Sequence, residues 1–128
     1  VMNNTLRQSE IAGVGHYVPE RVVTNADLIQ IMETTDEWIQ ERTGIRERRW
    51  FEEGKDTTAN MGANAARKAL EMAGLTPDDV QMIVFATLSP DYVFPGSGVL
   101  MQRELGIQAP IPAFDIRNQC SGFVYALS

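Results

Sequence analysis

The chain has 128 residues, of which 44% are hydrophobic and 22% are charged, and its formal net charge is −6 at pH 7. A chain of this length and composition is expected to fold around a hydrophobic core as one domain or as part of one. The acidic balance argues against general nucleic-acid binding, because phosphate backbones are held by clustered Lys and Arg. With one cysteine and no apolar stretch long enough to span a bilayer, we expect a cytoplasmic protein without internal disulfides.

The first part of the chain predicts short elements separated by turns. In order, these are a buried strand, a connecting loop, two helices, an irregular strand and a turn: residues 11–15, 17–25, 26–33, a helix between Thr35 and Gly44, 45–51 and 52–56. Asn25 is a residue type that caps helices. Thr35 and the two acidic residues after it predict the start of the second helix, because they place negative charge at the positive end of the helix dipole.

The second part alternates helices and strands more clearly. The predicted elements are a long helix capped by Gly74, a short turn, a strand, a loop, a helix closed by Gly106, a strand and the opening of a helix: 57–73, 76–80, 81–87, 88–98, 99–105, 111–116 and 120–128. This alternation predicts an α/β layered fold with a largely parallel sheet. The last predicted helix has no stop signal, so we expect that the natural chain continues beyond it.

Cys120, the only cysteine, lies where an apolar strand is predicted to turn directly into a helix. A lone cysteine is most often a small buried hydrophobe. At the carboxyl end of a strand in an open α/β sheet, however, ligands bind, and the unpaired N–H groups of the helix start can stabilise an oxyanion. The thiol is therefore a candidate nucleophile, which needs a basic partner. The only histidine, His16, is more simply interpreted as a structural or surface residue of a loop.

Three stretches carry a resemblance to a known family: DEWIQERTGIRERR, FPGSG and PAFDIRNQCSGFVYAL. In this order and spacing they resemble β-ketoacyl-acyl carrier protein synthase III, and the similarity covers nearly the whole chain. The resemblance implies a thiolase-like layered fold, with a mixed, mostly parallel sheet between helices in each of two similar halves. It also implies that residues 1–128 are the N-terminal part of such a synthase, an incomplete first half, and that the enzyme is a homodimer.

The resemblance further implies roles for individual residues. Cys120 matches the nucleophile that takes an acyl group from acyl-CoA and yields it to the carbanion made by decarboxylating malonyl-acyl carrier protein. Thr34, Trp38 and Arg42 match positions that hold the CoA nucleotide, and Phe94 matches a residue that crosses the dimer to line the partner subunit's acyl pocket. The family has no permanently bound cofactor and no metal site. Its catalytic His and Asn follow the cysteine and have no counterpart in this chain, so we expect the full-length protein to be an acyltransferase and the 128-residue chain alone to be inactive.

The residue types agree with these roles but also have simpler interpretations. Trp38 and Arg42 are four apart on one predicted helix, so an indole for adenine and a guanidinium for phosphate can lie side by side. The alternatives are core packing for Trp38, a solvated charge for Arg42 and loop packing for Phe94. Three further arginines can attract an anionic cofactor or form a solvated face: Arg46, Arg48 and Arg49.

Two alternatives to a synthase of fatty acid initiation stay open at this point, and a third is disfavoured. One is a related CoA-dependent condensing enzyme of a specialised pathway, because Asn118 and Gln119 stand where many family members have small residues. Another is an inactive fragment with the same fold. A Rossmann nucleotide-binding module is disfavoured, because Val18 occupies the third glycine position of G-x-G-x-x-G and a loop follows. The residues do not identify the starter acyl group.

Overall fold

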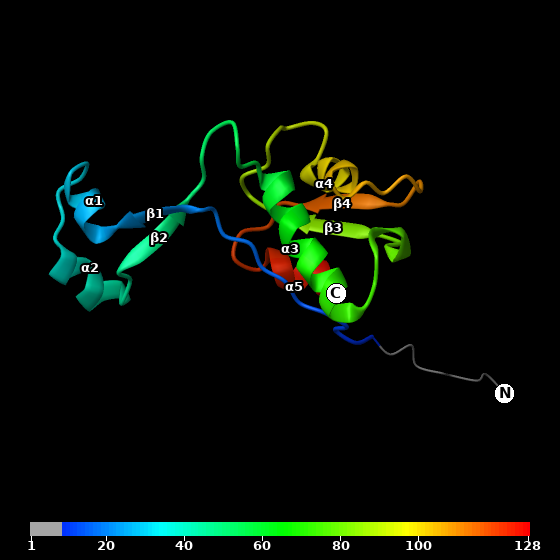
Figure 1. Cartoon of the computed structure of the whole chain (residues 1–128), viewed down its shortest axis with the longest axis horizontal. Coiled ribbons are helices and arrows are strands. Elements are labelled where there is room, and N and C mark those ends of the chain that lie inside the picture. Colours follow the sequence, from blue (N-terminus) through cyan, green and yellow to red (C-terminus); the bar gives the residue numbers. More distant parts are fainter. Residues whose placement is uncertain (1–8) are drawn as a thin grey trace.

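The computed structural model describes residues 9–128, which form two parts joined by two connecting segments (Figure 1). We call residues 21–50 the small lobe; its elements are β1 (Arg21–Thr24), α1 (Asn25–Ile29), α2 (Asp36–Thr43) and β2 (Glu47–Trp50). We call residues 58–128 the body; its elements are α3 (Thr58–Ala73), the 3-10 helix η1 (Pro77–Asp79), β3 (Ile83–Ala86), α4 (Ser97–Leu105), β4 (Ala113–Ile116) and α5 (Gly122–Leu127). The connecting segments are 9–20 and 51–57.

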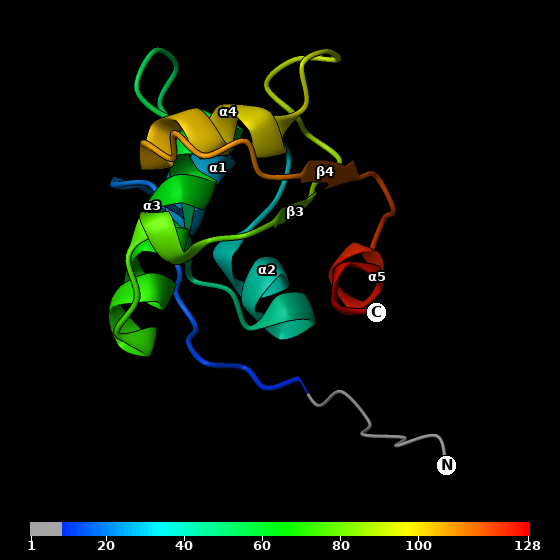
Figure 2. The same ribbon diagram turned by 90° about the vertical axis from the view of Figure 1, so that its right-hand side faces the viewer.

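The body is a layered α/β unit built around a parallel pair of strands. In β3 and β4, Ile83 lies opposite Ala113 and Ala86 lies opposite Ile116. Figure 2 shows α4 on one side of this pair and α5 on the other, and α3 packs against α4. Four buried side chains form the core of the body: Ala63, Ile83, Leu105 and Ile107. The expected α/β layered fold, with sheet between helices, is confirmed.

The helix ends of the body follow local capping rules. Thr57 Oγ1 accepts a hydrogen bond from Asn60 N and Asn60 Oδ1 accepts one from Thr57 N, both at 3.0 Å, so α3 begins with a capping box. At the other end, the backbone N–H of Gly74 closes α3, and that of Gly106 closes α4. Both helices were predicted, although α4 begins at Ser97, two residues before the predicted Val99.

The small lobe is an antiparallel two-stranded sheet with two short helices. β1 and β2 pair along their whole length, so the loop predicted over residues 17–25 is wrong at Arg21–Thr24. Before α2, Thr35 Oγ1 accepts a hydrogen bond from Trp38 N at 3.1 Å, and the helix ends at Gly44, whose φ of 71° is left-handed. The prediction for this helix is confirmed, because both of its signals act within one turn of the backbone.

The prediction that Asn25 caps the first helix is wrong. The cap is Thr24, which shares a capping box with Asp27, and α1 ends at Ile29 rather than near residue 33. Asn25 is only 2% exposed and joins three pieces of the small lobe. Its Nδ2 donates to Asp36 Oδ1 at 2.7 Å and to the Ile45 carbonyl at 2.9 Å, and its Oδ1 accepts from Arg48 Nη2 at 2.7 Å. These long-range partners decide its place, because a buried amide must find donors and acceptors inside the fold.

The predicted strand at residues 11–15 is also wrong. This segment pairs with no strand among residues 9–128 and instead runs along the backbone of α3. A Cβ added at Gly13 would lie 2.2 Å from the Ala69 carbonyl oxygen, and one added at Gly15 would lie 2.1 Å from the Ala65 carbonyl oxygen. The two glycines therefore allow a close approach between this chain and the helix, which the apolar sequence pattern alone does not distinguish from a buried strand.

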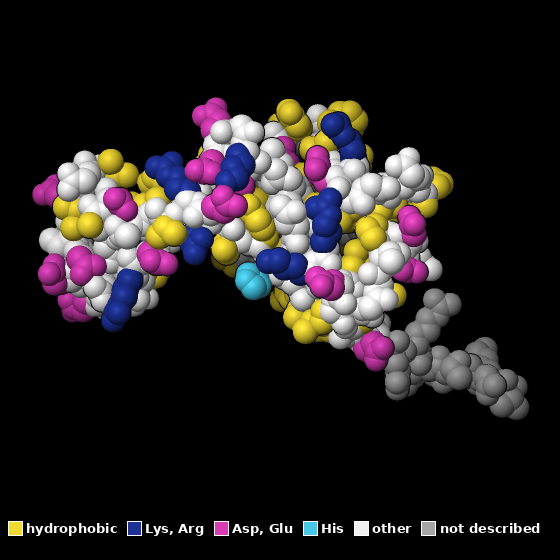
Figure 3. All heavy atoms as spheres, in the orientation of Figure 1, with side chains coloured by type: hydrophobic (Ala, Val, Ile, Leu, Met, Phe, Trp, Pro, Cys, Tyr) yellow, Lys and Arg dark blue, Asp and Glu magenta, His cyan; other side chains and the backbone are white. Residues whose placement is uncertain are grey.

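Charged side chains of both signs are interspersed on the face shown in Figure 3. Within residues 9–128, no helix is long and apolar enough to cross a membrane.

Candidate active site

Cys120 lies in the turn between β4 and α5 and is exposed. The interpretation of this thiol as a buried hydrophobe is therefore wrong. The predicted strand–turn–helix setting is confirmed. Gly122, the first residue of α5, is buried, and a Cβ added there would lie 3.5 Å from the Ala86 side chain of β3. The start of α5 is thus packed against the end of β3, which places the cysteine at the carboxyl end of the parallel strands.

A cavity of about 680 Å³ opens beside Cys120. Its walls come from α3, the end of β3 and the face of α5, and they are mostly apolar. Gly62 and Ala65 line the cavity on the α3 side with small side chains. Thr87, the residue after β3, also lines it. Asn118 and Gln119, the two polar residues before the cysteine, line the same cavity. The arrangement offers an exposed thiol beside a space that suits an apolar chain.

Phe94 lies in the loop between β3 and α4 and is 89% exposed. Its neighbours Tyr92 and Val93 are also exposed. The loop is nevertheless held at its beginning, because the Asp91 carboxylate accepts hydrogen bonds from the backbone N–H of Thr58 at 2.5 Å and of Ala59 at 2.8 Å. Asp91 thereby satisfies the free N–H groups at the start of α3.

The end of the same loop is held by the segment that leads to the cysteine. The Asp115 carboxylate of β4 accepts hydrogen bonds from Ser97 N at 2.7 Å and Gly98 N at 2.8 Å, and Arg117 Nη2 donates to the Val93 carbonyl at 3.2 Å. A Cβ at Gly96 would lie 2.6 Å from Asp115 Oδ1. The FPGSG and PAFDIR stretches are therefore in direct contact, and the glycine leaves room for the carboxylate that caps α4.

Thr34, Trp38 and Arg42 lie together at the start of α2 and along it. Thr34 and Trp38 line a cavity of about 340 Å³, and the Arg42 guanidinium carbon lies 6.0 Å from the centroid of the Trp38 ring. Trp38 is 56% exposed, so core packing is the wrong interpretation of this residue. Thr34 Oγ1 is buried and has no hydrogen-bond partner within the described part of the chain. The group combines an open indole face, a cation and a free hydroxyl.

The structure places this group and Cys120 in different parts of the molecule. The group belongs to the small lobe and the cysteine belongs to the body. Figures 1 and 2 both show α2 and α5 below the level of β3 and β4, so the two candidate sites lie toward the same side. His16 lies in the connecting segment 9–20, is exposed, and makes no hydrogen bond with Cys120.

Sequence reasoning missed the residues that hold these sites in place. Asn25 braces the small lobe, and Asp91, Asp115 and Arg117 fix the loop of Phe94. Each acts on backbone more than a turn away, so no local pattern marks it. Among residues 9–128, no group of three or more His, Cys, Asp or Glu side chains is arranged to hold a metal ion.

The layered body, with an exposed cysteine in the turn after a parallel strand, has the architecture of the thiolase fold. No protein-family model matches the chain. Among curated proteins, it is 46% identical over 120 residues to β-ketoacyl-[acyl-carrier-protein] synthase III from Coxiella burnetii, covering 94% of this chain and 38% of the relative. It is 50% identical over 122 residues to the protein of that name from Methylococcus capsulatus, covering 95% and 37%.

Solved structures agree with the sequence comparison. The chain matches 3-oxoacyl-[acyl-carrier-protein] synthase III from Aquifex aeolicus with a TM-score of 0.86 and 46% identity, covering 92% of this chain and 37% of that one. It matches a priming β-ketosynthase of a polyketide biosynthetic pathway with a TM-score of 0.83 and 38% identity, covering 96% and 38%. The resemblance to β-ketoacyl-acyl carrier protein synthase III is confirmed. The chain spans somewhat more than a third of the length of these relatives.

Proposed function

We propose that this chain contributes to a condensing enzyme of the β-ketoacyl-acyl carrier protein synthase III type, an acyltransferase that starts fatty acid synthesis. The observation that carries the proposal is Cys120, an exposed thiol at the carboxyl end of the parallel strands and beside a mostly apolar cavity. The identity of 46–50% to proteins of that name supports the same reaction type. This identity favours the synthase over a condensing enzyme of a specialised pathway.

In the proposed reaction, the Cys120 thiolate attacks the thioester carbonyl of acyl-CoA. The acyl–sulfur bond to CoA breaks, CoA leaves as its thiolate, and the acyl group is held as a thioester on the cysteine. Malonyl-acyl carrier protein then loses CO₂, and the resulting carbanion attacks this thioester. A carbon–carbon bond forms, the cysteine thiolate is released, and the product is the β-ketoacyl-acyl carrier protein. The cavity beside Cys120 would take the acyl chain.

The group of Thr34, Trp38 and Arg42 is the proposed site of the CoA nucleotide. The open face of the Trp38 indole can stack on adenine, and the Arg42 guanidinium can bind phosphate. The buried Thr34 hydroxyl, which has no partner within residues 9–128, is free to hydrogen-bond a ligand in the adjoining cavity. This combination fits an aromatic base attached to phosphate better than it fits either group alone.

Phe94 is proposed to act across a homodimer. Its side chain stands clear of its own chain, while Asp91 and Asp115 hold both ends of its loop. A well-held loop with an exposed ring is suited to insertion into a second copy, where the ring would line the acyl pocket. The catalytic His and Asn that the resemblance implies are proposed to belong to the remaining length of the enzyme, since the relatives are longer than this chain.

The decisive experiment is acylation of the full-length enzyme by acyl-CoA, followed by intact mass and peptide mapping. The acyl group is expected on Cys120, and Cys120→Ala is expected to abolish it while retaining CoA binding. The thiol should also be alkylated faster than a model thiol at about pH 7, and acyl-CoA should protect it. An enzyme that stays unacylated, or is acylated at another residue, contradicts the proposed function.

A further inference from the structure

The small lobe is attached to the body mainly through the two connecting segments. No helix or strand of the small lobe packs extensively on an element of the body within the described residues. Figure 1 shows segment 51–57 leading into the start of α3 and segment 9–20 passing beside α3 on its way to β1. Side chains of the two segments meet just before α3. Within residues 9–128, the position of the small lobe therefore depends on how these two segments are held against each other.

One contact between the segments is made by Lys55. Its Nζ lies 2.7 Å from Glu20 Oε2 and 3.1 Å from Glu52 Oε2. Glu20 belongs to the segment that enters the small lobe, and Lys55 and Glu52 belong to the segment that leaves it. The ammonium thus joins the two segments, and its hydrogen bonds to these carboxylates raise the pKa of Lys55.

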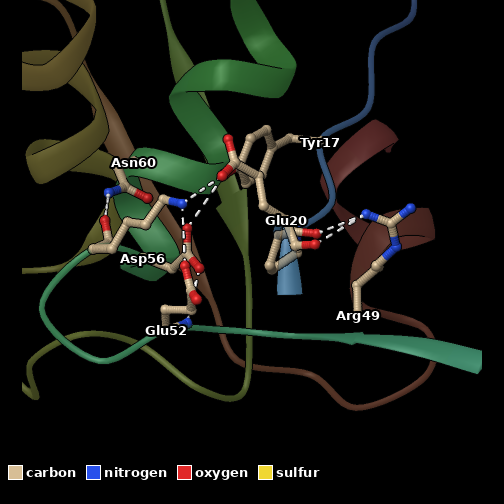
Figure 4. Close-up of polar contacts among 8 residues, drawn as sticks. Tyr17, Glu20, Arg49, Glu52, Asp56 and Asn60 are labelled. Atoms are coloured by element: carbon tan, nitrogen blue, oxygen red, sulfur yellow. Dashed lines mark hydrogen bonds and ion pairs between the residues drawn. The ribbon is translucent and has the colours of Figure 1, made fainter. Parts of the chain in front are cut away.

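A second contact is made by Tyr17 and Asp56, which Figure 4 shows pointing toward each other. The Tyr17 hydroxyl donates to Asp56 Oδ1 at 3.3 Å, and the Glu52 backbone N–H donates to Asp56 Oδ2 at 2.8 Å. Asp56 is only 7% exposed. A buried carboxylate needs such donors, so the two segments are linked through a group that cannot turn to solvent.

The contacts between segments 9–20 and 51–57, which we call the junction, are also fixed to the body. Asn60 of α3 donates from Nδ2 to the Lys55 carbonyl at 2.8 Å, and its Oδ1 accepts from Thr57 N at 3.0 Å. The entering segment runs along α3, where Gly13 and Gly15 lie against the helix backbone. Both segments therefore contact α3, and α3 also forms a wall of the cavity beside Cys120.

We propose that Tyr17, Glu20, Lys55 and Asp56 are positioning residues that set the distance and angle between the small lobe and the cysteine. This inference rests on the proposed function, because it assigns the CoA nucleotide to the small lobe and the thioester to the body. A substrate that binds both parts reaches Cys120 correctly only if the junction holds the small lobe at the right distance from the body. A thioester without a nucleotide needs only the body. The junction therefore acts on long substrates and not on short ones.

The test compares two substrates in the full-length enzyme carrying Tyr17→Phe and Lys55→Met together. The KM for acyl-CoA is expected to rise about threefold to tenfold, with kcat within about twofold of the parent. The KM for the same acyl group on N-acetylcysteamine, which lacks the nucleotide, is expected to stay unchanged. Arg103→Met, which replaces an exposed cation of α4 that forms no ion pair with either of these described segments, is the control and should alter neither value. An equal change for both substrates, or no change for either, overturns the proposal.

A second measurement is independent of catalysis. Amide hydrogen exchange in residues 17–20 and 51–57 of the double variant is expected to accelerate several-fold, with exchange in α4 unchanged. Unaltered exchange at the junction contradicts the inference even if the enzyme proves to have another activity. If the parent enzyme is not acylated by acyl-CoA, the proposed function fails, and the exchange result then decides the role of the junction by itself.

Discussion

The guanidinium of Arg42 lies over the indole of Trp38, one helical turn away on α2, with 6.0 Å between its carbon and the ring centroid. The stack is exposed and stands beside the cavity of Thr34. The small lobe has a second pair of the same kind, in which the Arg21 guanidinium carbon lies 5.4 Å from the Trp50 ring. Only the Trp38 pair adjoins the cavity of Thr34, so the Trp50 pair can serve as a control for it.

Replacement of the first pair is expected to weaken CoA binding. Trp38→Ala and Arg42→Met should each raise the Kd for CoA about tenfold, because each removes a contact worth about 1–2 kcal/mol when desolvated by a ligand. Titration calorimetry of the full-length enzyme measures the effect. Arg21→Met is the control, because it breaks an Arg–Trp pair of similar geometry outside the proposed site. Equal losses from Arg42→Met and Arg21→Met would show that the nucleotide does not bind at Trp38.

Gly15→Ala is expected to destabilise the protein by about 1–3 kcal/mol, the usual cost of overpacking. The new Cβ would lie 2.1 Å from the Ala65 carbonyl oxygen, which is a backbone atom of α3, so the clash is relieved only if the segment shifts off the helix. Urea unfolding gives the change. Gly122→Ala is the matched control, because a Cβ there meets only the Ala86 side chain at 3.5 Å. A neutral Gly15→Ala would mean that the segment does not lie on the helix as described.

Asp115→Ala is expected to lower stability by about 1–3 kcal/mol, because two backbone N–H groups at the start of α4 lose their acceptor. The loop of Phe94 should also become more sensitive to protease, since its C-terminal end is released. Urea unfolding and limited proteolysis measure the two effects. Asp78→Ala, which replaces an exposed aspartate of η1, serves as control. Protection of the loop at the parent level would argue that Arg117 alone holds it.

Asp27 gives an expectation for the pH dependence of stability. Its Oδ2 accepts hydrogen bonds at 2.7 Å from both the side chain and the backbone N–H of Thr24, and these bonds hold its pKa below the ordinary value. A lowered folded-state pKa contributes stability that is present above the unfolded pKa of about 3.9 and is lost as the pH falls through the folded value.

The destabilisation caused by Asp27→Asn should therefore be full near about pH 7 and should shrink as the pH falls below about 4. Urea midpoints across this range measure it, with Glu33→Gln as a control on an exposed carboxylate of the same lobe. A difference that does not depend on pH would show that the charge of Asp27 plays no part in the cap.

Helix positions could be predicted from the sequence because their signals are local. Thr35 acts on the N–H three residues later, and Gly44 and Gly74 act at the next backbone position after a helix. Such contacts form between residues close in sequence and do not depend on how the rest of the chain packs. The neighbourhood of Trp38 and Arg42 was predictable for the same reason, since a spacing of four places both side chains on one face of α2.

Contacts between distant segments could not be predicted in this way. The sequence alone determined the capped helices, the alternation that produces the α/β body, and the resemblance carried by three separated stretches. Only the tertiary structure decided that residues 11–15 lie on α3, that Asn25 braces the small lobe, and that Asp115 caps α4. It also decided that Cys120 is exposed. The physical reason is that burial and long-range hydrogen bonds depend on which neighbour is available, and that is settled only when the whole chain has packed.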